Sequence, residues 1–320
     1  MTATMTERVI SLLDMDCFYC QVEARDDPAL VGVPSAVVQY NEWKGGAIIA
    51  VNYEARAKGV TRNMRGDEAK KHCPEITLVM VPEQRGKADL TKYRDAGKEV
   101  IDVLVGFGAV VERASIDEAY IDITALVEEK RRVLDTIAHS LLPNTFVVGH
   151  EEPRQEGLET WLGASDKQGL TDNMRLAVGA SIMEEVRTAV HDKTGFRYSA
   201  GVAHNKVLAK LACGLHKPNR QTILPQDKVS ALFSKLKIGK VRGFGGKLGV
   251  TLMEEFGCAN MGDVAELGVA RLKERFDDKT ARWVHEMAQG LDLDPVKERD
   301  LPKSVGCSKN FRGPQMLDTR

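Results

Sequence analysis

The sequence lacks a hydrophobic run long enough to cross a membrane. No stretch approaches the roughly 20 apolar residues that a spanning helix needs. The N-terminus lacks the basic region of a secretory signal peptide, and its apolar run reaches Asp14 too soon for one. The sequence therefore predicts no membrane association and no export signal.

A net charge is almost absent as well. The chain has 45 Lys and Arg against 46 Asp and Glu, which gives a formal charge of −1. Overall charge therefore does not indicate nucleic-acid binding, and any such surface would have to be a local patch. With 43% hydrophobic and 28% charged residues over 320 positions, we expect a folded chain of two or three domains.

Cysteine is sparse and scattered. The six cysteines stand at positions 17, 20, 73, 213, 258 and 307, which favours reduced thiols in an intracellular protein over a disulfide framework. Cys17 and Cys20 form a CxxC pattern, but a zinc site would need a second pair. A redox pair is the alternative interpretation, and coincidence is favoured over both.

Apolar periodicity and turn residues predict mixed α and β structure. Strands are expected over residues 8–14, 35–39, 47–51, 77–81, 198–203 and 221–224. Helices are expected over residues 53–59, 67–72, 87–105, 126–142, 174–194 and 205–215. Residues 143–172 have little periodicity and are predicted to form a long surface insertion. From about residue 227 only short helices are expected, with a domain boundary near 225.

Adjacent carboxylates at Asp117 and Glu118 stand at the centre of residues 110–123, whose apolar-rich arms predict a β-hairpin. Neighbouring carboxylates repel unless a cation lies between them, and a hard divalent ion suits oxygen ligands. Asp14 ends the first predicted strand. If that strand neighbours the hairpin, three carboxylates could hold two Mg²⁺ ions for phosphoryl or nucleotidyl transfer. The alternative is three solvated strand-end acids.

Two basic clusters could bind a triphosphate. Tyr53 and Arg56 are three residues apart, so both can face one side of a helix, and Arg62 follows closely. The second cluster spans residues 204–210 and 217–220. For both clusters a solvated helix face is the default interpretation.

Several segments together resemble the Y-family translesion DNA polymerases, and within them the eta-type enzymes. The matching segments are residues 13–19, 39–40 with 43–46, 53–62, 114–120 and 211–222. The resemblance covers nearly the whole chain and is weakest over 143–172. It implies an α+β fold with right-handed polymerase architecture. The α/β palm would occupy 1–16 and 83–224, with a mostly antiparallel sheet and helices on one face. Fingers would span 17–82 and a helical thumb 225–300, and 301–320 would begin a truncated little finger.

The resemblance also implies a DNA-directed DNA polymerase activity. The enzyme would add a dNMP to a primer 3′-OH and bypass UV pyrimidine dimers in DNA repair and damage tolerance. Its partners would be primer–template DNA and a dNTP. Its cofactor would be two Mg²⁺ ions, with Mn²⁺ as a substitute. The protein would be a monomer in the nucleus. The family's sliding-clamp and ubiquitin-binding segments are not found in this sequence. We expect a fragment or short isoform with weak processivity, because a little finger supplies phosphate contacts.

Site residues follow from the same resemblance. The metal ligands would be Asp14, Asp117 and Glu118, completed by the backbone carbonyl of Met15. The residues expected around the nucleotide are Cys17, Phe18 and Tyr19 through their backbone amides, and Tyr53, Arg56 and Lys217 at the phosphates.

Three further roles concern the sugar, the base and the DNA, and a fourth concerns Asp16. Tyr19 would be the steric gate that excludes a ribose 2′-OH, and Gln39 with Arg62 would contact the template base and incoming nucleotide. Gly246 and Lys247, in a glycine-rich turn, would hold a DNA phosphate, with a plain helix cap as the alternative. Asp16 is expected to be a local hydrogen-bond acceptor rather than a metal ligand.

Other functions remain open from the residues alone. A palm-like nucleotidyl cyclase or a two-metal nuclease would use the same carboxylates without a primer–template. A catalytically weak DNA-binding or scaffold fragment is a rival of a different class. Within the family, a kappa-like or iota-like polymerase is the nearest alternative.

Overall fold

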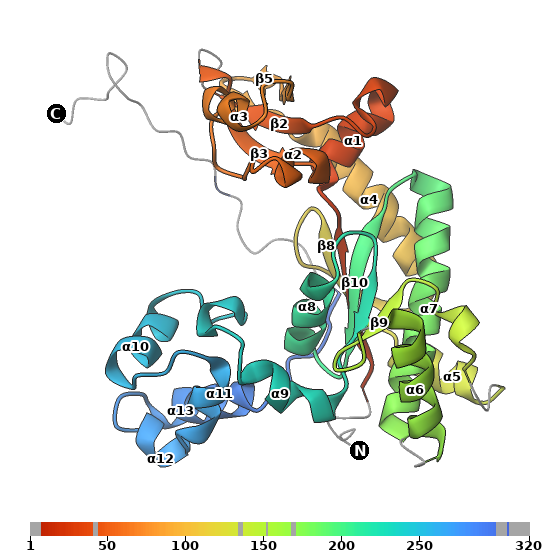
Figure 1. Ribbon diagram of the computed structural model, residues 1–320, viewed down its shortest axis with the longest axis vertical. Coiled ribbons are helices and arrows are strands. Elements are labelled where there is room, and N and C mark those ends of the chain that lie inside the picture. Colours follow the sequence, from red (N-terminus) through yellow and green to blue (C-terminus); the bar gives the residue numbers. More distant parts are fainter. Residues whose placement is uncertain are drawn as a thin grey trace.

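A six-stranded sheet forms the centre of the molecule (Figure 1). The computed structural model describes residues 8–40, 44–133, 137–151, 153–167, 171–298 and 306. Trp43 of one matching segment, and the predicted little-finger start over 301–320 apart from residue 306, lie outside these residues. Within them the fold is a mixture of helices and strands, as predicted. None of the described helices combines the length and apolar character required to cross a bilayer.

The central sheet has the strand order β7-β8-β1-β10-β11-β9. Its strands are β1 (Ile10–Met15), β7 (Val110–Arg113), β8 (Glu118–Asp122), β9 (Thr145–Val147), β10 (Tyr198–Ala203) and β11 (Gln221–Ile223). The pairings from β7 to β10 are antiparallel and the two pairings beyond β10 are parallel. The first predicted strand is thus an interior strand, with the predicted hairpin on one side of it.

Helices cover both faces of this sheet, so the expectation of helices on one face alone is wrong. One face carries α4 (Thr91–Gly106), α5 (Thr124–Arg131), α6 (Arg154–Lys167) and α7 (Thr171–Thr194), and α8 (Lys206–Leu215) lies on the other (Figure 1). The cause lies in β1. Leu13 and Met15 join the core under α4 and α7, whereas Ile10 and Leu12 pack with α8. A strand that is apolar at successive positions requires cover on both faces.

A second, smaller unit leaves the central sheet at the end of β1. It contains α1 (Phe18–Asp26), β2 (Ser35–Gln39), β3 (Ala47–Val51), α2 (Tyr53–Ala57), α3 (Gly66–His72) and β4 (Thr77–Met80). The strands form a separate sheet in the order β3-β2-β4, with its own core that includes Val38, Ile48 and Val60. The short strands β5 (Glu83–Gln84) and β6 (Lys87–Ala88) then lead to α4.

The predicted surface insertion over 143–172 is wrong for most of its length. β9 adds a parallel strand to the edge of the central sheet, and α6 packs against it and α7. Leu158 and Trp161 of α6 are 1% and 3% exposed. The helix predicted over 126–142 is also too long, since α5 ends at Arg131 and a 3₁₀ turn follows at His139–Leu141.

The C-terminal part consists of short helices, as predicted, with no strand among its described residues. They are α9 (Val229–Phe233), α10 (Lys247–Glu255), α11 (Met261–Glu266), α12 (Val269–Leu272) and α13 (Asp278–Ala288). This helical part lies to one side of the central sheet, below α8 in the view of Figure 1.

After α13 the chain returns to the central sheet. Lys206 of α8 is 2% exposed, and its Nζ lies 2.6 Å from Glu112 of β7 and 2.9 Å from Asp294. Arg8, just before β1, donates to the carbonyl oxygens of Leu293 and Asp294. The solvated helix face expected at Lys206 is therefore wrong, because this lysine joins the returning segment to the sheet.

Candidate active site

The predicted hairpin is confirmed as β7 and β8, and a serine shapes its bend. Val110 pairs with Asp122 and Arg113 with Ala119. In the bend, the Ser115 hydroxyl accepts from the backbone amides of Asp117 (3.2 Å) and Glu118 (3.0 Å). The same hydroxyl donates to Asp117 Oδ1 at 2.6 Å. The two acids are thus held at the start of β8 by the side chain of Ser115, two and three residues earlier.

The hairpin brings its acids beside Asp14. In the register of β1 and β8, Asp14 stands directly opposite Glu118. The amide of Met15 donates to the carbonyl oxygen of Asp117 at 2.9 Å, which fixes the bend to the end of β1. The three predicted acids line one cavity of about 890 Å³. The expected convergence of strand ends is therefore confirmed.

Two lysines partner these carboxylates. Lys217 Nζ lies 2.6 Å from Asp14 Oδ1, and Lys210 Nζ lies 2.7 and 2.8 Å from the two oxygens of Glu118. Burial raises the pKa of Asp14 to about 6, with Lys217 lowering it and the carboxylates of Glu118 and Asp117 raising it. Burial opposes the charge of Lys217, but Asp14 and neighbouring groups outweigh it, so the pKa of Lys217 is raised.

The arrangement fits a divalent cation in its chemistry rather than in its present side-chain positions. Among the described residues, no three His, Cys, Asp or Glu side chains are grouped closely enough to enclose an ion. The two ammonium groups bind the carboxylates instead. Nevertheless the donors are all oxygens, which hard cations prefer, and the acids repel one another when charged. The donor set therefore suits a hard divalent cation once the lysines move aside.

The start of α1 lines the same cavity. Cys17 precedes the helix in a left-handed conformation (φ 39°, ψ 48°). Phe18 and Tyr19 are in its first turn, where backbone amides have no partner within the helix. Such a terminus is a ready site for an anionic phosphate.

The CxxC pattern forms part of this turn. Cys17 and Cys20 are free thiols. Burial raises the pKa of Cys17 to about 12, and it raises that of Cys20 as well. A thiol that stays protonated is a poor nucleophile, which disfavours the redox interpretation.

Tyr19 is held by an aromatic neighbour. Its ring stacks on that of Tyr93 in α4, with centroids 4.1 Å apart and planes inclined by 18°. Tyr93 is fully buried and donates a hydrogen bond to Glu23. Because Tyr93 is fixed, the half-buried Tyr19 ring forms a firm wall of the cavity.

The first basic cluster lines the cavity too. The Arg56 guanidinium lies over the Tyr53 ring at 4.7 Å, and its Nε donates to the carbonyl oxygen of Val51. Arg62 is exposed and also lines the cavity, as does Lys217. This part of the chain therefore brings positive groups to the same hollow as the carboxylates.

Three predicted residues do not line this cavity. Gln39 is half-buried at the end of β2, opposite Ala47. Gly246 precedes α10 and Lys247 begins it, and both are exposed. Their predicted contacts with DNA remain predictions.

Several residues that shape the site carry no clear signal in the sequence. Lys210 was grouped with a surface helix, yet it binds Glu118. Gly97 of α4 allows the hairpin bend to approach, because a Cβ there would lie 2.5 Å from the carbonyl oxygen of Ile116. Ser115 was only part of a matching segment. Spacing along the sequence does not show that a lysine on the polar side of a helix, or a single glycine within a helix, belongs to a functional site.

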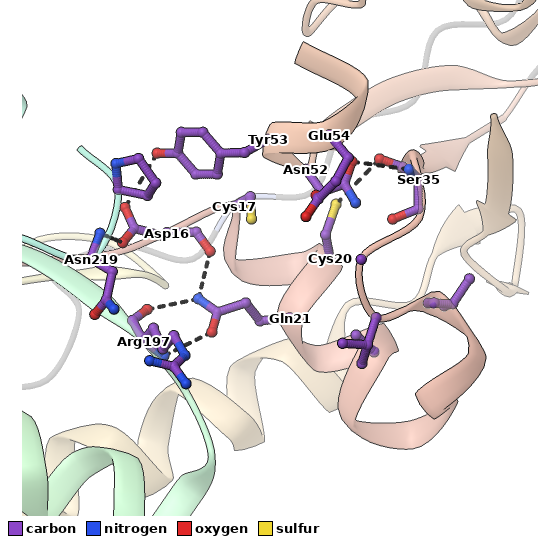
Figure 2. A pocket seen from close by; sticks show the side chains of 15 residues that line it. Asp16, Cys17, Cys20, Gln21, Ser35, Asn52, Tyr53, Glu54, Arg197 and Asn219 are labelled. Atoms are coloured by element: carbon purple, nitrogen blue, oxygen red, sulfur yellow. Dashed lines mark hydrogen bonds between the residues drawn. The ribbon is translucent and has the colours of Figure 1, made fainter. Parts of the chain in front are cut away.

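A smaller cavity of about 320 Å³ lies next to the first and shares Cys17 and Tyr53 with it. Figure 2 shows Asp16, Tyr53 and Asn219 together at one side of it. The Gln21 side chain bridges the carbonyl oxygens of Asp16 and Arg197, at 2.5 and 2.7 Å. The wall between the two cavities is thus built around the turn that follows β1.

Comparison with known proteins adds two family matches. Residues 13–214 match the impB/mucB/samB family, and residues 236–291 match the DNApol eta/Rev1 HhH motif. The first match covers the smaller unit, most of the central sheet and the three acids that line the cavity, and the second covers α10 to α13.

Individual relatives agree with these matches. DNA polymerase eta of Drosophila melanogaster is 47% identical over 96% of this chain and 37% of its own length. DNA polymerase eta of Arabidopsis thaliana is 45% identical over 97% of this chain and 47% of its own. DNA polymerase IV of Alkalilimnicola ehrlichii is 30% identical over 96% of this chain and 71% of its own. The chain spans less than half the length of these two eta relatives.

Proposed function

Because the chain belongs to the impB/mucB/samB family, the Y-family DNA polymerases, we propose that it catalyses template-directed addition of a dNMP to a primer 3′-OH. Translesion synthesis past UV pyrimidine dimers is the proposed cellular role, by similarity to relatives named DNA polymerase eta. This chain spans less than half the length of those eta relatives. Its activity, its substrate and its partners are therefore proposed here by similarity.

One observation carries the proposal. Asp14 and Glu118 stand opposite each other on β1 and β8, with Asp117 at the adjoining bend. The cavity that these acids line also receives Arg56, Arg62 and the first turn of α1. Negative groups for a cation and positive groups for a polyphosphate in one hollow are what nucleotidyl transfer requires.

Asp14, Asp117 and Glu118, with the Met15 carbonyl, are the proposed ligands of two Mg²⁺ ions, for which Mn²⁺ can substitute. Bound ions of this kind lower the pKa of an attacking hydroxyl and neutralise charge on the phosphates. Lys210 and Lys217, which now bind Glu118 and Asp14, must move for the ligands to be free. Lys217 then has the reach to contact a phosphate at the cavity wall.

The nucleotide-binding roles follow the geometry of the cavity. The amides of Cys17, Phe18 and Tyr19 would donate to the triphosphate, together with Tyr53, Arg56 and Lys217. The Tyr19 ring, fixed against Tyr93, would exclude a ribose 2′-OH. Gln39 and Arg62 would contact the template base and the incoming nucleotide.

The proposed domains follow the units of the fold. Residues 1–16 and 83–224 would form the palm, 17–82 the fingers and 225–300 the thumb, with 301–320 beginning a little finger. Gly246 and Lys247 at the start of α10 would hold a DNA phosphate, which is consistent with the match of residues 236–291 to an HhH motif. A monomer acting on DNA in the nucleus completes the proposal.

Primer extension tests the proposed function directly. The chain is incubated with a primer annealed to a template, four dNTPs and Mg²⁺, at low salt. Incorporation that follows the template base, requires the divalent ion and continues past a thymine dimer supports the proposal. Absence of template-directed incorporation would contradict it.

The rival functions predict other results in the same assay. A nucleotidyl cyclase or two-metal nuclease would turn over dNTP or cleave DNA without an annealed primer. A DNA-binding scaffold fragment would bind the duplex and add nothing. A kappa-like or iota-like polymerase would extend the undamaged primer but stall at the dimer. The carboxylate pair on β1 and β8 favours the catalytic alternatives over the scaffold.

A further inference from the structure

We propose that Asp16 is a positioning residue that fixes the two triphosphate contacts Tyr53 and Lys217 in place. It is two residues beyond Asp14 and is not among the proposed metal ligands. This inference rests on the proposed function, because it concerns how the same site holds its nucleotide. Figure 2 shows Asp16 at the junction between Tyr53 and Asn219.

The Asp16 carboxylate is almost fully buried and saturated with donors. Its side chain is 5% exposed. Oδ1 accepts from Tyr53 Oη (3.3 Å), Ser199 Oγ (2.9 Å) and Lys217 Nζ (3.4 Å). Oδ2 accepts from Ser199 Oγ (3.0 Å) and the amide of Asn219 (2.7 Å). A buried carboxylate needs such donors, because without them its desolvation is costly.

These donors come from parts of the chain far apart in sequence. Tyr53 begins α2 in the smaller unit, Ser199 belongs to β10, and Lys217 and Asn219 lie in the turn after α8. Asp16 itself stands just past β1, where the chain leaves the central sheet. One carboxylate therefore ties the smaller unit to the central sheet at the edge of the nucleotide cavity.

The turn that carries Lys217 is held from two sides. The amide of Asn219 donates to Asp16, and the Asn219 side-chain oxygen accepts from Arg187 NH1 at 3.1 Å. Asn219 has φ 53°, in the left-handed region, which Asn adopts more often than most other residues. Asp16 thus sets the path of the backbone two residues after Lys217.

Asp16 also gives the Lys217 ammonium a second acceptor. In the present structure Lys217 Nζ is 2.6 Å from Asp14 and 3.4 Å from Asp16. When Asp14 serves as a metal ligand, that first contact is given up. Asp16 then remains to keep the ammonium at the cavity wall, where a phosphate can reach it.

Loss of the Asp16 charge therefore affects one substrate selectively. Without that charge, Tyr53 keeps only its contact with Arg56. Lys217 has no acidic partner left once Asp14 serves as a metal ligand, so neither side chain has its fixed position beside the triphosphate. Binding of a dNTP should weaken, whereas binding of DNA and the choice of sugar should not change. If Asp16 had a merely structural role, its loss would instead impair dNTP binding, DNA binding and sugar selection together, and it would lower the stability of the fold.

The test compares Asp16→Asn with Ser199→Ala. Asn has the size of Asp but lacks its charge. Its NH₂ group also replaces one acceptor oxygen and would face a hydrogen-bond donor. Ser199→Ala removes one donor to Asp16 and touches neither Tyr53 nor Lys217 directly. The full chain is bound to a primer ending in a dideoxynucleotide, so that no chemistry occurs, and the Kd of dATP opposite template T is measured with Mg²⁺. We expect the Kd to rise roughly tenfold for Asp16→Asn and less than about twofold for Ser199→Ala.

A double variant separates positioning from a general loss of structure. If Asp16 acts through Tyr53 and Lys217, Tyr53→Phe should weaken dATP binding less in the Asp16→Asn background than in the original chain. Thermal unfolding and the Kd for primer–template are measured alongside.

Each outcome decides a separate question. Equal dATP affinity in Asp16→Asn and the original chain would overturn the inference, as would parallel losses of DNA binding and folding. If the original chain itself bound no dATP opposite template T, the proposed function would fail instead. Should Asp16→Asn not fold, Asp16→Glu takes its place, because it keeps the charge but displaces the carboxylate. An unchanged dATP Kd in Asp16→Glu would then overturn the inference, and a selective rise of that Kd would support it.

Discussion

Asp14 and Glu118 face each other across paired strands, yet each carboxylate binds a different lysine. Lys217 lies 2.6 Å from Asp14, and Lys210 contacts both oxygens of Glu118. The positive charge that the acids need is thus supplied by two side chains of the protein. Substitution of a carboxylate should therefore remove a proposed metal ligand, whereas substitution of its lysine should free that ligand.

Replacing Asp117 or Glu118 by Ala should abolish primer extension, with a loss of at least about 100-fold. Each change removes an oxygen donor that the proposed metal site needs, and both side chains are partly exposed, so folding should be retained. Rates of single-nucleotide incorporation and thermal unfolding are measured together. Asp102→Ala, an exposed acid on α4 paired with Lys98, is the matched control. Retained incorporation in either site variant would refute the catalytic assignment.

Replacing Lys210 by Met should tighten binding of a divalent cation. The ammonium competes with the ion for both oxygens of Glu118. The pair is partly exposed, so its loss corresponds to about 0.2–1 kcal/mol, or roughly a 1.5- to 5-fold lower Kd. Binding of Mn²⁺ followed by its paramagnetic resonance signal measures this. Lys98→Met, which removes an exposed lysine on α4, should leave Mn²⁺ affinity unchanged. Weaker Mn²⁺ binding in Lys210→Met would argue against competition.

Replacing Tyr19 by Ala should raise the use of ribonucleotides. The ring is held against Tyr93 at 4.1 Å, so its removal opens space that no neighbour readily fills. The ratio of kcat/KM for rNTP to that for dNTP should rise by roughly 10- to 100-fold. Tyr19→Phe keeps the ring and should keep the ratio. Unchanged sugar selection in Tyr19→Ala would reject the gate role.

Replacing Gly97 by Ala should impair the site without altering any side chain in it. A Cβ at this position of α4 would lie 2.5 Å from the carbonyl oxygen of Ile116, next to Asp117. The bend must move, and we expect incorporation to fall at least about tenfold even though Ala favours a helix by about 0.5–1 kcal/mol. Gly106→Ala in the same helix meets no atom within 4 Å and is the matched control. Equal rates for the two variants would show that the bend tolerates displacement.

The sequence was most informative where pattern and chemistry coincide. β1 and the hairpin were predicted from apolar runs that end in acids, and their pairing places Asp14 opposite Glu118. Asp16 was expected to be a local hydrogen-bond acceptor. The structure confirms that it accepts hydrogen bonds, but the local part is wrong, because Tyr53, Ser199 and Asn219 are all distant in sequence. Those contacts depend on how strands distant in sequence are brought together.

Two failures have identifiable physical causes. β9 is only three residues long, and the large apolar residues of α6 are limited to Leu158, Trp161 and Leu162, so neither element gives a strong period. Lys206 and Lys210 looked like a solvated helix face because charge is normally exposed. Here the partner acids on β7, on β8 and after α13 come from other parts of the chain, which spacing along one helix does not reveal.

The segment that returns after α13 is one of several attachments of the C-terminal helices to the central sheet. The chain enters these helices after β11, and Lys206 and Arg8 bind residues 293 and 294 where it leaves them. Between these two points, one hydrophobic core runs from Ile10 and Leu12 of β1 to Phe244 of the C-terminal part. A rotation of these helices against the sheet would therefore expose apolar surface to water, and that cost opposes such a motion.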